Sequence, residues 1–289
     1  MNEYEIKKIK NVLENINSHL NKDEYPFSLN DLEYKNFLEA ISIVNLNKIQ
    51  IPEKKAIDYL KRGNAYFGKK KYKDALYNYS KAIEADAFLL KAYLNRAFVY
   101  NKIGKLSEAS MDFNFAIKLD PKCERAYSGI AVSYFYIADA FDNEKNKYFR
   151  SIENFLKSIE LKPDNAYSYN GIGWIYYCEK KNLEAIENFN KAISLEPRFK
   201  NAYYNRGLSY MRIENYIQAI EDFTKGIKIQ HSNNHFFYSS RSFCYKALGK
   251  EKEYEEDQIK ADELFSKLTD VEIKEIECPF FKKGVLYAS

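Results

Sequence analysis

Apolar residues recur along most of this chain with helical spacing and also at a longer, fixed period. Six tyrosines are spaced 34, 34, 42, 34 and 35 residues apart, and each is followed seven residues later by a second tyrosine. The six are Tyr59, Tyr93, Tyr127, Tyr169, Tyr203 and Tyr238. A period in the thirties is typical of stacked repeat proteins. With Ala56 as position 1, further units begin at Leu90, Glu124, Ala166, Lys200 and His235.

Each unit predicts a pair of helices. Positions 4, 8 and 11 lie on one face of a first helix, and positions 20, 24 and 27 lie on one face of a second. Small residues at 8, 20 and 27 allow the backbones to approach, while aromatic residues at 4, 11 and 24 fill the remaining space. Pro121, Pro163 and Pro197 near position 32 end the second helix, because proline has no amide donor. We therefore expect the periodic tyrosines to lie mostly in the packing between helices.

The pattern resembles the tetratricopeptide repeat, most clearly in KAYLNRAFVYNKIGKLSEASMDFNFAIKLDP (91–121) and NAYYNRGLSYMRIENYIQAIEDFTKGI (201–227). The resemblance covers about residues 56–268. It implies an all-α, right-handed superhelical solenoid whose first helices line a concave groove. Six repeats are expected, at 56–89, 90–123, 124–165, 166–199, 200–234 and 235–268.

Three regions depart from the repeat. Unit three has eight extra residues within Phe135–Arg150, which predict a lengthened helix pair with a tip near Asp142–Asn146, or alternatively a plain loop. The last helix, Glu251–Leu268, is dense in charge and fits a polar cap. The tail 269–289 carries the apolar cluster Cys278–Phe281, which is expected to fold back onto the last helices or to dock into a groove.

The N-terminal segment 1–55 is predicted to form a helical cap. Apolar spacing indicates a helix over Glu3–Leu20, and Asp31 is suited to cap a second helix that ends near Asn47. The second of these helices also fits the remnant of a degenerate repeat.

Charge and cysteine usage narrow the class of protein. The chain has 45 basic and 41 acidic residues, without the concentrated basic excess of a nucleic-acid binder. Neither a signal peptide nor an apolar run long enough to span a membrane is apparent. Four scattered cysteines indicate reduced thiols of an intracellular, cytoplasmic protein, although an intermolecular disulfide is an alternative.

We find no motif for catalysis, a cofactor or a metal. His231 and His235 have the i, i+4 spacing of metal ligands, but they lie in a predicted turn without HExxH or a nearby cysteine. Gly171-Ile172-Gly173 lacks the third glycine and the preceding strand of a dinucleotide loop. We therefore expect a protein that is not an enzyme.

The resemblance places positions 2, 5, 6, 9, 12 and 13 of each first helix on the inner face of the groove. Asparagine at these positions can pair with a peptide backbone, and lysine or arginine can hold a carboxylate. The single tryptophan is at such a position, although it also fits packing against a neighbouring helix or the extra hairpin. The candidate groove residues are Asn64, Lys91, Asn95, Arg125, Asn170, Trp174, Asn205 and Arg212.

Some proteins of this family bind the acidic C-termini of heat-shock chaperones through a carboxylate clamp. Asn64, Asn95 and Arg125 match that clamp in part, whereas Leu60 and Gly129 stand where it needs Lys and Arg. Arginines at position 7 (Arg62, Arg96, Arg206 and Arg241) are predicted to be structural.

The sequence thus predicts a non-catalytic scaffold that binds a partner protein or extended peptide of unknown identity in the groove. A helical-repeat RNA binder and a self-assembling structural protein are the alternatives. Measuring RNA binding at increasing salt distinguishes the RNA binder from the protein-binding scaffold, because phosphate contacts weaken steeply with salt.

Overall fold

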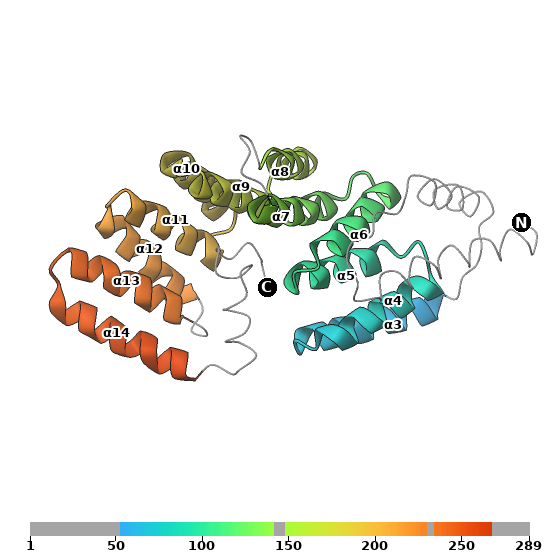
Figure 1. Cartoon of the computed structure of the whole chain (residues 1–289), viewed down its shortest axis with the longest axis horizontal. Helices are drawn as coiled ribbons and strands as arrows, with labels where there is room; N and C mark the ends of the chain where they lie inside the picture. The colour runs from blue at the N-terminus through green and yellow to red at the C-terminus, as the bar shows by residue number, and fades with distance from the viewer. Residues whose placement is uncertain (1–52, 142–147, 230–233, 268–289) are drawn as a thin grey trace, which may run out of the picture. The chain divides into compact units, whose positions relative to one another are not determined.

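The computed structural model describes residues 53–141, 148–229 and 234–267, and all the regular structure in these ranges is α-helical. The predicted N-terminal cap, the hairpin tip near 142–146 and the tail 269–289 lie outside the described residues. The all-α fold of stacked antiparallel helix pairs is confirmed for the part of the chain that is described (Figure 1).

The chain divides into two compact units, 1–120 and 121–289. The described helices of the first are α3 (Glu53–Gly68), α4 (Tyr72–Ala85), α5 (Leu90–Lys102) and α6 (Leu106–Leu119). Those of the second are α7 (Glu124–Phe141), α8 (Phe149–Leu161), α9 (Ala166–Cys178), α10 (Asn182–Leu195), α11 (Lys200–Arg212), α12 (Tyr216–Ile229), α13 (His235–Ala247) and α14 (Glu251–Ser266). Each odd-numbered helix packs against the helix that follows it, and within each unit the pairs stack on one another.

Small and aromatic residues set the distance between the two helices of a pair, as the spacing predicts. Position 8 faces position 24: a Cβ added to Gly173 would lie 2.7 Å from the Phe189 ring, and one added to Gly207 would lie 2.6 Å from the Phe223 ring. Both rings are fully buried. A larger residue at position 8 would therefore push the helices of its pair apart.

The turn inside each pair has one recurring geometry. Position 15 has a left-handed backbone in the five pairs with an unextended turn, at Lys70, Gly104, Lys180, Glu214 and Gly249. The next amide donates to the carbonyl of the position 11 tyrosine, as in Lys181 N–H to Tyr176 O at 2.9 Å. This is the Schellman arrangement, which normally takes glycine at the left-handed residue. Three pairs carry a side chain there instead and accept some backbone strain.

The third pair is lengthened on one side only. Its first helix, α7, has 18 residues, whereas α5, α9, α11 and α13 have 13 each. Its second helix, α8, has 13 residues and is no longer than the 14-residue α4, α6, α10 and α12. The described part of the extra sequence continues α7, and the predicted tip near 142–146 lies outside the described residues.

The last pair replaces the usual contact between positions 8 and 24 with a hydrogen bond. Gln258 Nε2 donates to Ser242 Oγ at 2.6 Å, where other pairs place an aromatic ring against a small residue. Most of α14 is exposed. This polar surface agrees with the expected cap.

Candidate functional site: the inner faces of the first helices

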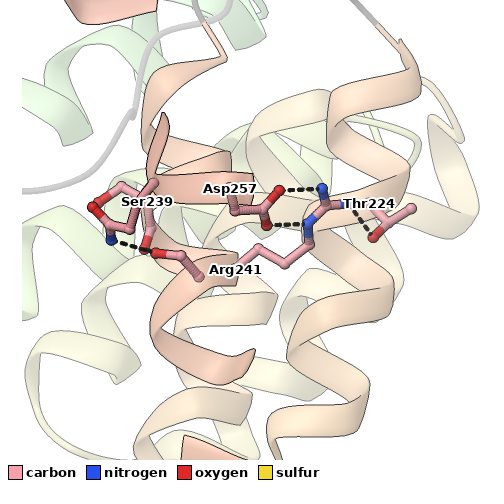
Figure 2. Close-up of polar contacts among 6 residues, drawn as sticks. Thr224, Ser239, Arg241 and Asp257 are labelled. Carbon is pink, nitrogen blue, oxygen red and sulfur yellow. Dashed lines mark hydrogen bonds and ion pairs between the residues drawn. The ribbon is translucent and has the colours of Figure 1, made fainter. Parts of the chain in front are cut away.

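Three of the four arginines at position 7, Arg96, Arg206 and Arg241, join neighbouring pairs and are structural, as predicted, whereas Arg62 is exposed. Figure 2 shows Arg241 on α13 between two partners: Nε and Nη2 each donate to the Asp257 carboxylate at 2.7 Å, and Nη1 donates to Thr224 Oγ1 of α12 at 2.8 Å. One side chain therefore links both helices of its own pair to the preceding pair.

The same three-way contact recurs twice. Arg96 contacts Asp112 and Ser80 Oγ, and Arg206 contacts Asp222 and the Asn190 Oδ1. In each case the partners stand at positions 23 and 25. For both aspartates, burial raises the pKa of the carboxyl above its ordinary value, while the paired arginine opposes the shift. Each arginine–aspartate ion pair stays charged, and the burial of the two charges costs desolvation free energy.

The periodic tyrosines flank these arginines. The Arg96 guanidinium lies 5.8 Å from the Tyr93 ring and 5.9 Å from the Tyr100 ring, and Arg241 lies similarly between Tyr238 and Tyr245. These distances are within the range of cation–π attraction. Of the twelve rings, Tyr93, Tyr100 and Tyr203 are buried and the others are half-buried. Two of the half-buried rings, Tyr169 and Tyr210, pack against buried core clusters.

In the first compact unit, residues 1–120, two predicted groove residues are joined by a hydrogen bond. Asn95 Nδ2 donates to Asn64 Oδ1 at 2.8 Å, and the Tyr79 hydroxyl donates to the same oxygen at 2.9 Å. Burial raises the pKa of Tyr79 to about 12, so its hydroxyl stays a donor at neutral pH. Asn64 is exposed and Asn95 is half-buried, and Lys91 is exposed on the first turn of α5.

In the second unit, asparagines again bridge successive first helices. Asn205 Nδ2 on α11 donates to Asn170 Oδ1 on α9 at 3.1 Å, and both residues have no exposed surface. One helical turn after Asn170, Trp174 is 4 % exposed and stacks on Tyr177 with ring centroids 5.0 Å apart.

Arg212 at the end of α11 completes this cluster. Its guanidinium lies 3.6 Å from the centre of the Tyr177 ring and donates to the Tyr177 carbonyl. Burial raises the pKa of Tyr177, and the nearby Arg212 opposes that shift. We name Asn170, Trp174, Tyr177, Asn205 and Arg212 the α9–α11 cluster. Arg125, the second residue of α7, is exposed.

Several polar atoms of the cluster are buried without a partner. Asn170 Nδ2, Asn205 Oδ1 and Trp174 Nε1 are each inaccessible to solvent and make no hydrogen bond. A buried polar group without a partner costs about 1–3 kcal/mol. The cluster therefore leaves two donors and one acceptor unsatisfied in the packing between α9 and α11.

Sequence reasoning selected four of the five cluster residues and missed Tyr177. Position 12 was among the inward positions, but Tyr177 stands next to the periodic Tyr176. The signal that distinguishes them is spacing, because Tyr177 follows Trp174 by three residues and so lies over the same helix face.

Three family models match within this chain. Two models described as tetratricopeptide repeat match residues 90–123 and 201–233, and a model described as TPR repeat matches residues 173–214. Together with the helix pairs, these matches show that the chain contains tetratricopeptide repeats.

Curated relatives match over part of their length. Hsp70-Hsp90 organizing protein 3 of Arabidopsis thaliana is 30 % identical over 111 residues, which is 38 % of this chain and 18 % of the relative. RNA polymerase II-associated protein 3 of Rattus norvegicus is 30 % identical over 122 residues, which is 42 % of this chain and 17 % of the relative. The matched segment thus spans less than a fifth of either relative.

Solved structures share the fold across most of the chain. The Cut9-Hcn1 assembly of the APC/C superposes with a TM-score of 0.66 at 16 % identity, covering 96 % of this chain and 54 % of that one. A tetratricopeptide repeat protein from Parabacteroides merdae gives a TM-score of 0.59 at 17 % identity, covering 98 % and 99 %. Identities this low carry the fold and no further property.

Within the described ranges, no helix has the length and apolar character needed to cross a bilayer. The same residues contain no group of three or more His, Cys, Asp or Glu side chains arranged to hold a metal ion. His235 lies buried at the start of α13 rather than in an exposed turn, and His231 lies outside the described residues.

Proposed function

We propose that this protein is a non-catalytic interaction scaffold that binds an extended peptide segment of a partner protein along the inner faces of α9 and α11. The observation that carries the proposal is the set of unpartnered atoms in the α9–α11 cluster. An extended peptide backbone offers a carbonyl to Asn170 or Trp174 and an amide to Asn205. Such recognition fixes the backbone and leaves the choice of side chains to neighbouring surfaces.

The aromatic part of the cluster supports the same role. Tryptophan, tyrosine and arginine are the residues in which binding energy concentrates at protein interfaces. Trp174, Tyr177 and Arg212 form a continuous stack beside the asparagines. The names of the relatives, which describe organizing and associated proteins, favour a role in assembly.

The first unit supports a weaker version of this site. Asn64 and Asn95 already satisfy each other and Tyr79, so fewer groups there await a ligand. Leu60 is buried and apolar at a position where an acidic-tail clamp needs a cation. We therefore propose Lys91 and Asn95 as secondary contacts within the first unit and Arg125 as a separate contact within the second, and we disfavour an acidic chaperone tail as the main ligand.

The remaining features fit six repeats in a reducing compartment. We propose repeat boundaries at 56–89, 90–123, 124–165, 166–199, 200–234 and 235–268, because five of the described first helices begin at the first residue of their unit. Cys123, Cys178 and Cys244 are not joined in disulfides, which supports the cytoplasm as the site of action.

A peptide-display selection tests the binding proposal. Enriched peptides are expected to bind the full chain and to lose at least about tenfold in affinity against Asn170→Leu/Asn205→Leu, which removes about 1.4 kcal/mol or more. Asn188→Leu is the matched control, because Asn188 lies on α10 and donates only to the Glu184 carbonyl. Equal binding to the double variant, with an unchanged helical signal, contradicts the proposal.

A further inference from the structure

We propose that the second helices of the second compact unit carry a further docking surface, and that its occupant is a basic amphipathic helix of a partner protein. The surface consists of an apolar row, Phe149, Leu183 and Ile217, and an acidic row, Glu153, Glu187 and Glu221. Both rows lie on α8, α10 and α12, whereas the α9–α11 cluster lies on first helices. The inference therefore goes beyond the proposed function, since it assigns the scaffold a second and separate site.

The apolar row repeats one structural position in three successive pairs. Its members stand at position 18, near the start of α8, α10 and α12, and they are exposed by 64, 67 and 62 % in chain order. The repeat does not need an apolar side chain there, because the other three pairs have exposed polar residues at this position. These are Lys73, Ser107 and Lys252. A single exposed apolar side chain is ordinary, but three at equivalent positions form a surface suited to a partner.

The acidic row stands at position 22, one helical turn and about 6 Å beyond the apolar row on the same helix faces. A lysine follows each of these glutamates at position 26, but its side chain is engaged elsewhere. Lys157 Nζ donates to Glu160 at 2.8 Å, and Lys191 Nζ lies 5.9 Å from the centre of the Tyr169 ring. Lys225 lies against a tyrosine in the same way. Within the described residues, the three glutamates are exposed and form no ion pair.

The carboxylates decide which occupant fits the apolar row. A second copy of the chain that docks through the same face would place one acidic row against another, because a two-fold interface pairs a surface with itself. Like charges opposed across an interface disfavour that complex, and an anionic lipid surface is repelled for the same reason. A partner with lysine or arginine along one edge of an apolar face is complementary to both rows at once. The acidic row lies on one side of the apolar row only, so it also fixes the direction of the partner.

The shape of the surface favours a helix as the partner element. The rows are side chains on three separate helices and include no strand edge that could pair with an extended backbone, whereas a helix satisfies its own backbone groups. One first helix packs between each second helix and the next, which places successive members of a row about 10–15 Å apart. Two or three turns of a partner helix cover about 11–16 Å, so a helix of roughly 14–20 residues contacts all three.

The test is a selection from a displayed library of amphipathic helices against the full-length chain, with counter-selection against Phe149→Ser/Leu183→Ser/Ile217→Ser. Serine is compatible with position 18, since Ser107 occupies it in the second pair. Enriched helices are expected to have apolar residues two or three turns apart and lysine or arginine along one edge. They are expected to bind the triple serine variant at least about tenfold more weakly than the wild type. The control Tyr77→Ser/Ile259→Ser removes side chains that are 61 and 69 % exposed elsewhere and is expected to leave binding unchanged.

The acidic row is tested by reversing its charge. Association of the enriched helices, followed by biolayer interferometry at low salt, is expected to slow by at least about tenfold in the variant with lysine at all three positions. That variant is Glu153→Lys/Glu187→Lys/Glu221→Lys. The difference from the wild type is expected to shrink as salt screens the charges. A matched variant reverses three exposed carboxylates elsewhere and is expected to keep most of the rate. It is Asp58→Lys/Glu255→Lys/Asp262→Lys.

Three results overturn the inference. No displayed helix distinguishes the wild type from the triple serine variant, or the helices that do so ignore the charge reversal, or Asn170→Leu/Asn205→Leu abolishes their binding and so places them on the α9–α11 cluster. The extended peptides selected for the proposed function are expected to bind the triple serine variant like the wild type, which also shows that the variant is folded. If those peptides ignore Asn170→Leu/Asn205→Leu while the helices behave as expected, the proposed function fails and the second site stands.

Discussion

Replacing Asp112 by alanine is expected to destabilise the first unit by about 3–5 kcal/mol, because it leaves a buried guanidinium without its counter-charge. The Arg96 and Asp112 side chains are 2 and 4 % exposed and share two hydrogen bonds of 2.8 Å. Ser80 Oγ remains as a neutral acceptor after the substitution. Water has little access to replace the carboxylate.

The corresponding substitution in the last pair, Asp257→Ala, serves as the comparison for the loss of stability. The Arg241 and Asp257 side chains are 15 and 8 % exposed, so solvent reaches the arginine and Asp257→Ala is expected to cost only about 1–2 kcal/mol. The double variant Arg96→Met/Asp112→Leu is expected to recover at least about half of the loss caused by Asp112→Ala, since it removes both the charge and its desolvation.

Hydrogen exchange followed by mass spectrometry suits the measurement, because a repeat array need not unfold in one step. Amides of α5 and α6 report on Arg96, and those of α13 and α14 report on Arg241. The reasoning fails if Asp112→Ala and Asp257→Ala lower protection equally, or if the apolar double variant is less stable than Asp112→Ala.

Three further predictions concern the turns, a histidine and a glycine. Lys180→Gly is expected to raise stability by about 0.5–1 kcal/mol in urea unfolding, because position 15 is left-handed, whereas Gly104→Ala is expected to lower it by a similar amount. Burial and nearby Lys200 lower the pKa of His235, so the unfolded state binds more protons below its ordinary pKa of 6.5 and stability is expected to fall as pH drops below about 6.5. His235→Phe should flatten that dependence in thermal melts at pH 5 and 8. Gly171→Ala places a Cβ 2.3 Å from the Phe155 ring and is expected to lower the free energy of unfolding by about 1–3 kcal/mol in the urea assay.

The helix pairs were predictable because every unit repeats the same local chemistry. Small residues at position 8 and rings at position 24 are visible in the sequence, and their contact follows from helical spacing. The arginines of position 7 were recognised as structural, but their aspartate partners sixteen residues later were not. Which side chains meet across two helices depends on how the helices are rotated and placed relative to each other.

The sequence predicted which residues form the candidate site, but not the hydrogen bonds that they make. Inward positions follow from the family resemblance, and they selected Asn170, Trp174, Asn205 and Arg212. That Asn170 and Asn205 bond to each other and leave unpartnered atoms depends on side-chain orientation across two repeats. The period of the tyrosines is visible in the sequence. That most of their rings are half-buried beside an arginine follows only from the three-dimensional packing.

The three-way arginine contact does not occur in every pair. The third and fourth pairs have Ile130 and Ile172 at position 7, with Asn154 and Asn188 at position 23. In a linear array the coupling between neighbours decides how far unfolding spreads. Strong links at Arg206 and Arg241 tie the last three pairs into one block, whereas an isoleucine gives only apolar contact. Force applied to the ends of the chain should therefore release the helices in separate steps, with the last three pairs yielding together.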